Sequence, residues 1–292
     1  MSKPSRKLIT LAGITTDRNT VLKFREPAGT PLDALFKCVL NGSYRKPFLV
    51  EDLEHRALCF ALDGGTQSEM RLDDPEALEG EYTRKMMGFL VFTARPKRVL
   101  MIGLGGGSLV KYCHRHLPAT QVAVVEIDPE VIALRTHFCV PPDDRRLQVI
   151  NEDGACYVAQ MAAKGQRSDV MLVDAYDRFG IAKAVSERGF LENAKQTLGG
   201  HGVFVMNILG EVDECERHID MIQSVFGDPV IVIAMKFESN LVVFAGNALR
   251  SQRRLMSTHR NAKRTESKLG LFFPNLLRQL GECQQRSGIR NP

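Results

Sequence analysis

The segment from Arg98 to Asp128 most constrains how this chain can fold. An apolar run, Val99 to Ile102, leads into the glycine-rich stretch 103–107, and a second apolar run, Val122 to Val125, ends at Glu126. This pattern predicts a strand, a glycine turn, a helix and a second strand. Glycines let a ligand approach the backbone, the helix start offers free N–H groups, and an acid about 20 residues on can bind both ribose hydroxyls. The unit therefore predicts an adenosine-type ligand.

Length and composition favour a globular protein with one large α/β domain and a smaller appendage. The chain has 292 residues, of which 44% are hydrophobic and 25% charged. Its longest apolar runs fall far short of the ~18 residues that a membrane helix needs. The N-terminal segment shows no cleavage site of a signal peptide, so we expect a cytoplasmic protein that does not associate with a membrane. The cysteines are scattered with no CxxC pair, which favours reduced thiols and no metal site.

Positive charge is concentrated at the carboxyl end. From Leu249 onward, ten Arg or Lys residues face two Glu residues, so this tail carries +8 and the rest of the chain −3. Such an excess can attract nucleic acid, an acidic protein or an anionic membrane surface. We prefer a helix packed on the domain edge and expect no nucleic-acid partner, because the tail also has an apolar face. That face consists of Leu255, Leu269, Leu271, Phe272, Phe273, Leu276, Leu277 and Leu280.

The chain is expected to have three parts. Residues 1–80 predict a domain of short β-strands with a hairpin at Asp63-Gly64-Gly65-Thr66, residues 81–248 a domain that binds the adenosyl ligand, and residues 249–292 a basic helical tail. Strands are predicted at 8–14, 20–24, 48–50, 56–62, 67–72, 98–103, 121–127, 147–151, 169–174, 202–207, 229–236 and 241–246. Helices are predicted at 81–92, 108–116, 129–138, 154–163, 186–198 and 213–226.

Strands that alternate with helices of this length predict a parallel sheet with helices on both faces. The last two strands are joined only by Lys236 to Asn240, too short a link for a helical crossover, so they must run antiparallel. A nicotinamide-binding Rossmann domain would instead want a glycine at Ser108 and a sheet that stays parallel. We therefore predict an α/β fold: a class I methyltransferase-like, Rossmann-like sheet with a terminal antiparallel strand, plus a small N-terminal β-hairpin domain.

Acidic residues follow successive strands of the predicted sheet. Glu126 ends the second strand, Asp153 follows the third, and Asp174 follows the apolar run 169–173. Ligands of open α/β sheets bind at the carboxyl ends of the strands. At this edge Asp153 can accept a hydrogen bond from an adenine amino group. These acids make the glycine loop a stronger indication of a nucleoside site than the loop would be alone.

The chain resembles the spermidine synthase family of aminopropyltransferases, in a likeness that runs from about Leu58 to Ala245. The hairpin with Gln67 is the family-specific part, and the remainder is shared with methyltransferases in general. The matching motifs are Leu62-Asp63-Gly64-Gly65-Thr66-Gln67-Ser68, Tyr82, Met86-Met87, the glycine loop, Val125-Glu126-Ile127-Asp128, Asp153-Gly154 and Asp174-Ala175-Tyr176-Asp177. The resemblance also implies a homo-oligomer, which we expect to be a dimer.

The resemblance implies a sulfonium donor, decarboxylated S-adenosylmethionine or S-adenosylmethionine, and no metal. The residues that would hold this donor are Gln67, Gly103, Gly105, Gly107, Glu126 and Asp153. Asp174 would be the catalytic acid that takes the proton of a small-molecule amine acceptor. That role makes chemical sense, because an alkyl ammonium group has a pKa near ~10.4 and must lose a proton before it attacks carbon.

The acceptor would be held by Tyr82, Tyr176 and Asp177. Each of these has a plainer alternative, since an aspartate in a loop is often a turn residue and a tyrosine is often a packing residue. Gln67 could likewise be an ordinary polar residue of the hairpin.

Two positions depart from the family pattern. Gly106 stands where the family carries an aspartate that faces the amine of the donor, and Arg178 stands in place of a proline. Without that aspartate, the site lacks a negative charge that would repel the carboxylate of intact S-adenosylmethionine.

Three functions therefore stay open. We prefer aminopropyl transfer to a polyamine or another amine. The alternatives are methyl transfer to an amine of a small molecule or protein, and nucleoside binding without turnover.

Overall fold

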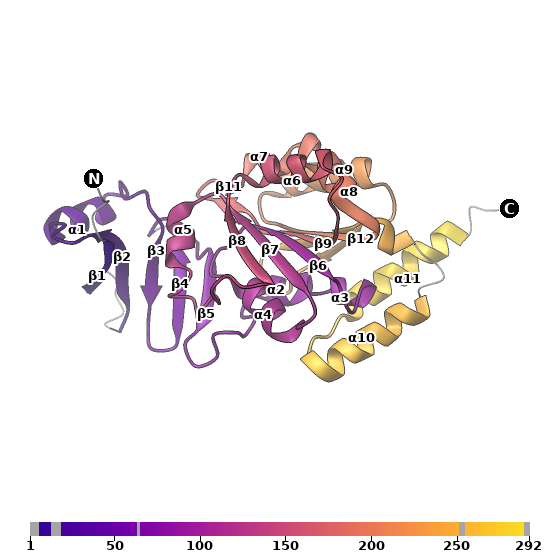
Figure 1. Cartoon of the computed structure of the whole chain (residues 1–292), viewed down its shortest axis with the longest axis horizontal. Coiled ribbons are helices and arrows are strands. Elements are labelled where there is room, and N and C mark those ends of the chain that lie inside the picture. The colour runs from indigo at the N-terminus through magenta and orange to yellow at the C-terminus, as the bar shows by residue number, and fades with distance from the viewer. Residues whose placement is uncertain (1–5, 13–18, 63–64, 251–254, 289–292) are drawn as a thin grey trace.

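Two β-sheets form the frame of the protein, and a pair of helices lies at the end opposite to the N-terminal sheet (Figure 1). The computed structural model describes residues 6–12, 19–62, 65–250 and 255–288. The tip of the expected hairpin, Asp63-Gly64, and the last two residues of the first expected strand lie outside these residues. In the described part, no helix is long and apolar enough to cross a membrane.

The N-terminal sheet is antiparallel throughout, and its strands follow chain order. Its strands are β1 (Arg6–Ala12), β2 (Val21–Pro27), β3 (Phe48–Glu51), β4 (His55–Cys59) and β5 (Ser68–Arg71). The sequence prediction missed helix α1 (Leu32–Leu40), which packs Leu35 and Val39 against the buried Phe24. Leu35 and Val39 are four residues apart, so they lie on the same face of the helix.

The seven-stranded sheet confirms the predicted class I methyltransferase-like fold. Its order is β13-β14-β12-β9-β6-β7-β8, and β14 pairs antiparallel with both of its neighbours while the other pairs are parallel. The antiparallel strand is thus the last in the sequence but lies inside the sheet. The strands are β6 (Arg98–Ile102), β7 (Gln121–Glu126), β8 (Leu147–Asn151), β9 (Ser168–Val173), β12 (Leu198–Ile208), β13 (Ile231–Ala234) and β14 (Leu241–Ala245).

Helices cover both faces of this sheet, as alternating side chains on the strands require. Val99 and Met101 belong to one buried face, Leu100 and Ile102 to the other. The helices are α2 (Glu81–Met86), α3 (Phe89–Phe92), α4 (Ser108–His116), α5 (Pro129–Leu134), α6 (Gly154–Ala163), α7 (Lys183–Ser186), α8 (Arg188–Thr197), α9 (Val212–Phe226), η1 (Asn247–Arg250), α10 (Leu255–Leu269) and α11 (Pro274–Gly288). A further hairpin consists of β10 (Tyr176–Asp177) and β11 (Gly180–Ile181).

The helix expected at 81–92 is split into α2 and α3 at Gly88. A side chain at Gly88 would have its Cβ 2.9 Å from atoms of Leu276 and Phe244, so the chain passes too close to its neighbours for a larger residue. The domain boundaries expected at 80 and 248 stay predictions; the first lies between β5 and α2, and the second lies inside η1.

The basic tail forms two helices whose apolar residues pack on the large domain. Leu271, Phe273, Leu276 and Leu280 are buried, whereas Phe272 is 59% exposed. The side chain of Leu255 lies outside the described residues. α10 contacts α3, and α11 contacts β13. Most of the apolar residues predicted for this face thus pack against the domain, as expected for a helical segment on the domain edge.

β6 and β9 are neighbouring strands at the point where the strand order reverses: β7 and β8 lie on one side of β6, and β9 and β12 on the other. This switch point places the glycine loop beside Asp174. Gly103 has a φ of +95°, and a Cβ there would lie 2.1 Å from the backbone oxygen of Asp174. The Asp174 amide also donates to the Ile102 carbonyl, at 2.9 Å. Only glycine fits this approach.

We expect Gly103→Ala to destabilise the fold by about 2 kcal/mol or more, because the new methyl group meets backbone and forces strain in a left-handed conformation. Urea unfolding followed by circular dichroism measures this loss. Gly189→Ala in α8 is the matched control, because nothing lies within 4 Å of its Cβ position. It should be neutral or slightly stabilising. Equal stability of the two variants would contradict the prediction.

Candidate active site

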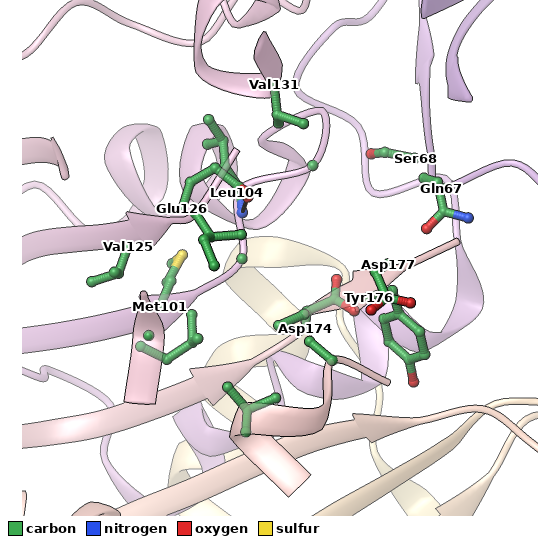
Figure 2. Close-up of a pocket in the computed structure, with 18 of the residues that line it drawn as sticks. Gln67, Ser68, Met101, Leu104, Val125, Glu126, Val131, Asp174, Tyr176 and Asp177 are labelled. Atoms are coloured by element: carbon green, nitrogen blue, oxygen red, sulfur yellow. Dashed lines mark hydrogen bonds between the residues drawn. The ribbon is translucent and has the colours of Figure 1, made fainter. Parts of the chain in front are cut away.

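A cavity of about 410 Å³ opens where the glycine loop, the acidic strand ends and the N-terminal sheet meet. Its walls contain every residue predicted for the donor and the acceptor except Gly107. Gly107 instead has a φ of +70° and immediately precedes α4. Figure 2 shows Glu126 beside Leu104 at one side, Gln67, Tyr176 and Asp177 at the other, and Asp174 between them in this view. The predicted residues that line the cavity are Gln67, Tyr82, Gly103, Gly105, Glu126, Asp153, Asp174, Tyr176 and Asp177.

Glu126 holds the glycine loop in place. One of its carboxylate oxygens accepts a hydrogen bond from the Leu104 amide at 2.9 Å, and the other accepts from the Asp128 amide at 2.8 Å. Burial raises the pKa of Glu126 above its usual value, although these backbone donors oppose the shift. Each carboxylate oxygen has a second lone pair, so hydroxyl donors of a ribose can still bind.

Asp153 forms the N-terminal cap of α6, because its side chain accepts a hydrogen bond from the Cys156 amide at 2.9 Å. This structural task and a contact with a ligand are compatible, since the cap uses one carboxylate oxygen and the residue also lines the cavity. Each carboxylate oxygen has two lone pairs, so Asp153 can still accept a hydrogen bond from an amino group.

Asp174 lies deep in the cavity within a small hydrogen-bonded network. Its Oδ1 accepts from the Asn207 side-chain amide at 2.9 Å, and Tyr82 donates a further hydrogen bond. Asn240 donates to the Asn207 amide oxygen, at 2.9 Å, and so fixes its orientation. The hydroxyl of Tyr176 donates to the Asn207 backbone carbonyl at 3.0 Å. These contacts hold the carboxylate in one position, and no ion pair of the described residues includes it.

The network leaves Asp174 more basic than an ordinary aspartate. Burial raises its pKa, and the hydrogen bonds from Asn207 and Tyr82 oppose but do not cancel this effect. Burial also raises the pKa of Tyr82 well above its usual value, with the charge of Asp174 adding to the shift. Tyr82 therefore stays a protonated donor while Asp174 can accept a proton.

Tyr82 is positioned by a reciprocal contact between α2 and the β13–β14 loop. The Glu238 carboxylate accepts from the amides of Glu81 and Tyr82, at 2.5 and 3.1 Å. In return, the Glu81 carboxylate accepts from the amides of Lys236 and Phe237, at 2.9 and 3.4 Å. These contacts satisfy free N–H groups at the start of α2 and fix the tyrosine beside Asp174.

Asp177 and Gln67 lie at the rim of the cavity, and both also make local contacts. Asp177 is exposed and accepts from the Phe179 amide at 2.7 Å within the β10–β11 turn, as the plainer alternative foresaw. Gln67 donates to the Gly65 carbonyl at 3.3 Å. Their roles toward a ligand stay predictions.

Gly106 lies against two side chains that take up the space of any substituent. A Cβ at this position would lie 2.7 Å from the Ser68 hydroxyl oxygen and 2.9 Å from the Phe138 ring. Ser68 and Phe138 thus occupy the space that an acidic side chain at position 106 would need, and both would have to shift to admit one.

The charges around the cavity favour a cationic ligand. Of the residues that the structure places in its walls, Glu126, Asp153, Asp174 and Asp177 are acidic, and Lys183 is the one basic residue. Negative charge at a concave surface attracts cations such as a sulfonium or an ammonium group. Within the described residues, no group of three His, Cys, Asp or Glu could hold a metal ion.

The sequence interpretation did not find the residues that support Asp174. From the sequence, Asn207 at the end of its strand could line the acceptor pocket or have a capping or solvent role, and Asn240 and Glu238 had no assigned role. A polar residue at the end of the apolar run 203–206 was a usable signal for Asn207, which is 2% exposed. Asn240 and Glu238 come from a connecting loop, and only the tertiary structure brings that loop to the cavity.

The fold and the cavity define the protein as a member of the methyltransferase-like α/β class with an adenosyl-type pocket. Comparison with known proteins agrees: the model of the spermine/spermidine synthase domain matches residues 79–228. The polyamine aminopropyltransferase of Chromobacterium violaceum is 33% identical over 222 residues, which cover 76% of this chain and 84% of that protein. The chain therefore belongs to the spermine/spermidine synthase family and is a transferase.

Solved structures show the same fold in both branches of this class. Human methyltransferase-like protein 13, in complex with SAH, is 26% identical with a TM-score of 0.58 and covers 65% of this chain and 93% of that chain. A spermidine synthase in complex with the transition-state analogue AdoDATO is 16% identical, with a TM-score of 0.56, and covers 94% of this chain and 87% of that chain. At that identity the second likeness concerns the fold alone.

We expect Asn207→Ala to raise the pKa of Asp174 further, because the variant removes a donor that stabilises the charged carboxylate. Carbon-13 NMR titration of the Asp174 carboxyl group measures this change, and circular dichroism verifies that the variant is folded. Asn275→Ala on the exposed face of α11 is the control and should leave this pKa unchanged. A pKa of Asp174 that falls or stays constant in Asn207→Ala would show that the hydrogen bond does not stabilise the charge.

Proposed function

We propose that the protein transfers an aminopropyl group from decarboxylated S-adenosylmethionine to a small-molecule amine, with a polyamine as the preferred acceptor. The observation that carries this proposal is Asp174, a basic carboxylate held by Asn207 and Tyr82 inside the cavity. The family and its named polyamine aminopropyltransferases support the same reaction.

The donor occupies the part of the cavity next to the glycine loop. Its ribose hydroxyls bind Glu126, its adenine amino group donates to Asp153, and Gly103 and Gly105 allow the nucleoside to lie against the backbone. Gln67 faces the sulfonium side chain. The volume of about 410 Å³ lies in the range of small-molecule sites.

The acceptor amine approaches from the rim formed by Tyr82, Tyr176 and Asp177. Asp177 attracts the ammonium form, and Asp174 takes one proton from the nitrogen that reacts. The nitrogen lone pair then attacks the aminopropyl carbon bound to sulfur, the carbon–nitrogen bond forms, and the carbon–sulfur bond breaks. Its electron pair leaves with sulfur, so the cationic sulfonium becomes a neutral thioether, methylthioadenosine. Catalysis comes mainly from the alignment of the two substrates and from proton removal.

A second candidate reaction is methyl transfer from intact S-adenosylmethionine to an amine of a small molecule or protein. Two observations favour it: Gly106 leaves no acid to repel the carboxylate of that donor, and Ser68 and Phe138 fill the place. The likeness to human methyltransferase-like protein 13 points the same way. The catalytic role of Asp174 would be the same in both reactions.

A homodimer and a cytoplasmic location, both expected from the sequence, stay predictions. Size-exclusion chromatography with light scattering tests the first of them.

Asp174→Asn should lower kcat at least 100-fold, because a general base typically contributes a factor of 10²–10⁴. The melting temperature should stay the same or rise, since an amide can keep the Asn207 contact and carries no buried charge. Release of methylthioadenosine or S-adenosylhomocysteine in the presence of amines measures turnover. Asp220→Asn, on the exposed side of α9, makes the same charge change and should retain full activity. Full activity of Asp174→Asn would remove the proposed base.

Calorimetric titration of the two donors separates the two reactions. Decarboxylated S-adenosylmethionine should bind roughly tenfold more tightly, about 1.4 kcal/mol, because a donor carboxylate would face the acidic cavity wall. Tighter binding of intact S-adenosylmethionine would contradict aminopropyl transfer and support methyl transfer. Binding of either donor with no turnover of any amine would instead leave a binding protein.

A further inference from the structure

A second cavity, of about 280 Å³, lies at the amino ends of the strands, at the edge of the sheet opposite to the donor cavity. It shares no wall residue with the donor cavity. The starts of β6, β7 and β8, the α6–β9 connection and residues 157 and 161 of α6 enclose it. Its walls include Arg98, Gln121, Arg146, Tyr157, Met161 and Arg167.

The floor of this cavity is apolar and its rim is basic. Leu100 and Ala123 of the sheet and Tyr157 and Met161 of α6 belong to one apolar cluster between the sheet and this helix, and they supply the floor. The rim carries four arginines, which come from three separate segments of the chain: Arg98, Arg145, Arg146 and Arg167. Tertiary structure rather than a local charge run therefore gathers them.

These arginines have no carboxylate partner among the residues that the structure describes. Arg98 donates to the Arg167 backbone carbonyl at 3.2 Å, and Arg146 donates to the His114 carbonyl at 3.0 Å. No ion pair involves Arg145 or the Arg167 side chain within that same part of the chain. Four like charges around one hollow repel one another, and a bound anion would relieve this repulsion.

The nearby carboxylates are occupied by other contacts. Asp169 accepts from the backbone amides of Lys97 and Arg98, at 2.6 and 3.0 Å. Asp144 accepts from the amides of Arg146 and Leu147, both at 2.7 Å. Asp144 also pairs with His114 at 3.2 Å, and His114 in turn contacts the Arg146 guanidinium group at 3.1 Å. Within the described residues, neither acid forms a direct ion pair with the arginines of the rim.

We propose that this cavity binds a small organic phosphate of the nucleoside phosphate class, whose phosphates contact the arginines and whose planar body lies on the apolar floor. Guanidinium groups bind phosphate oxygens with paired, charge-assisted hydrogen bonds, which an arginine cluster at a rim provides. Tyr157 offers an aromatic surface for a planar ring. Gln121, Gln148 and Gln166 supply amide donors and acceptors around the ring.

Helix α6 connects this site with the donor cavity. Asp153 and Gly154, at its start, line the donor cavity, whereas Tyr157 and Met161, one and two turns further along, line the second cavity. A ligand that settles on Tyr157 and Met161 therefore contacts the same rigid element whose cap faces the donor.

Titration calorimetry of the full chain with uridine triphosphate, which carries no adenine, tests the proposal. We expect saturable binding of one molecule per chain, with uridine and inorganic tripolyphosphate each at least tenfold weaker. The double variant Arg98→Gln/Arg167→Gln should weaken binding at least tenfold, because it removes two phosphate contacts. Arg217→Gln/Arg260→Gln, on exposed faces of α9 and α10, makes the same charge change and should bind like the unmodified protein.

Ala123→Leu provides an independent variant, since it fills the floor without a change of charge and should also weaken binding at least tenfold. Thermal melting verifies that each variant is folded. Equal loss of affinity in the two arginine double variants would show a general charge effect and overturn the proposal. Displacement of uridine triphosphate by adenosine would place the probe in the donor cavity, and equal affinity for tripolyphosphate would refute the apolar contact. Either result, or the absence of saturable binding, would also overturn it.

Discussion

The close approach of Gly103 to the backbone of Asp174 is the contact on which the rest of the site depends. It joins the ends of β6 and β9, the two strands between which the sheet changes direction. The donor loop and the proposed base therefore lie side by side with almost no freedom to separate. Glu126 extends this arrangement to the end of β7, because it accepts hydrogen bonds from the amide of Leu104, next to Gly103, and from the amide of Asp128.

The chemistry of the cavity follows from how this edge treats charge. Asp174 is half-buried and has neutral donors as partners, which keeps it basic enough to accept a proton, and none of the ion pairs of the described residues includes it. A partly desolvated carboxylate of this kind opposes folding, and the network of Asn207, Asn240 and Tyr82 limits that effect. At Gly106, where the resemblance to the family implies an acid, the side chains of Ser68 and Phe138 occupy the neighbouring space instead.

Helix α6 gives the two cavities a common wall, although they lie at opposite edges of the sheet. One edge gathers carboxylates, and the other gathers arginines. The basic tail is a separate feature, since its helices pack through apolar residues against α3 and β13.

The sequence by itself determined where the strands of the large sheet lie along the chain, the position of the glycine turn and the acids at the strand ends. Hydrophobic period, glycine and strand-end carboxylates are local signals. It also required the antiparallel final pair, since five linking residues allow no crossover. It missed α1, whose packing face consists of only two buried residues, and the break at Gly88, where neighbours distant in the chain leave no room. Only the tertiary structure decided the partners of Asp174, the side chains that occupy the space at Gly106 and the arginine cavity. Each of these depends on side chains brought together from distant segments, and no local pattern records such contacts.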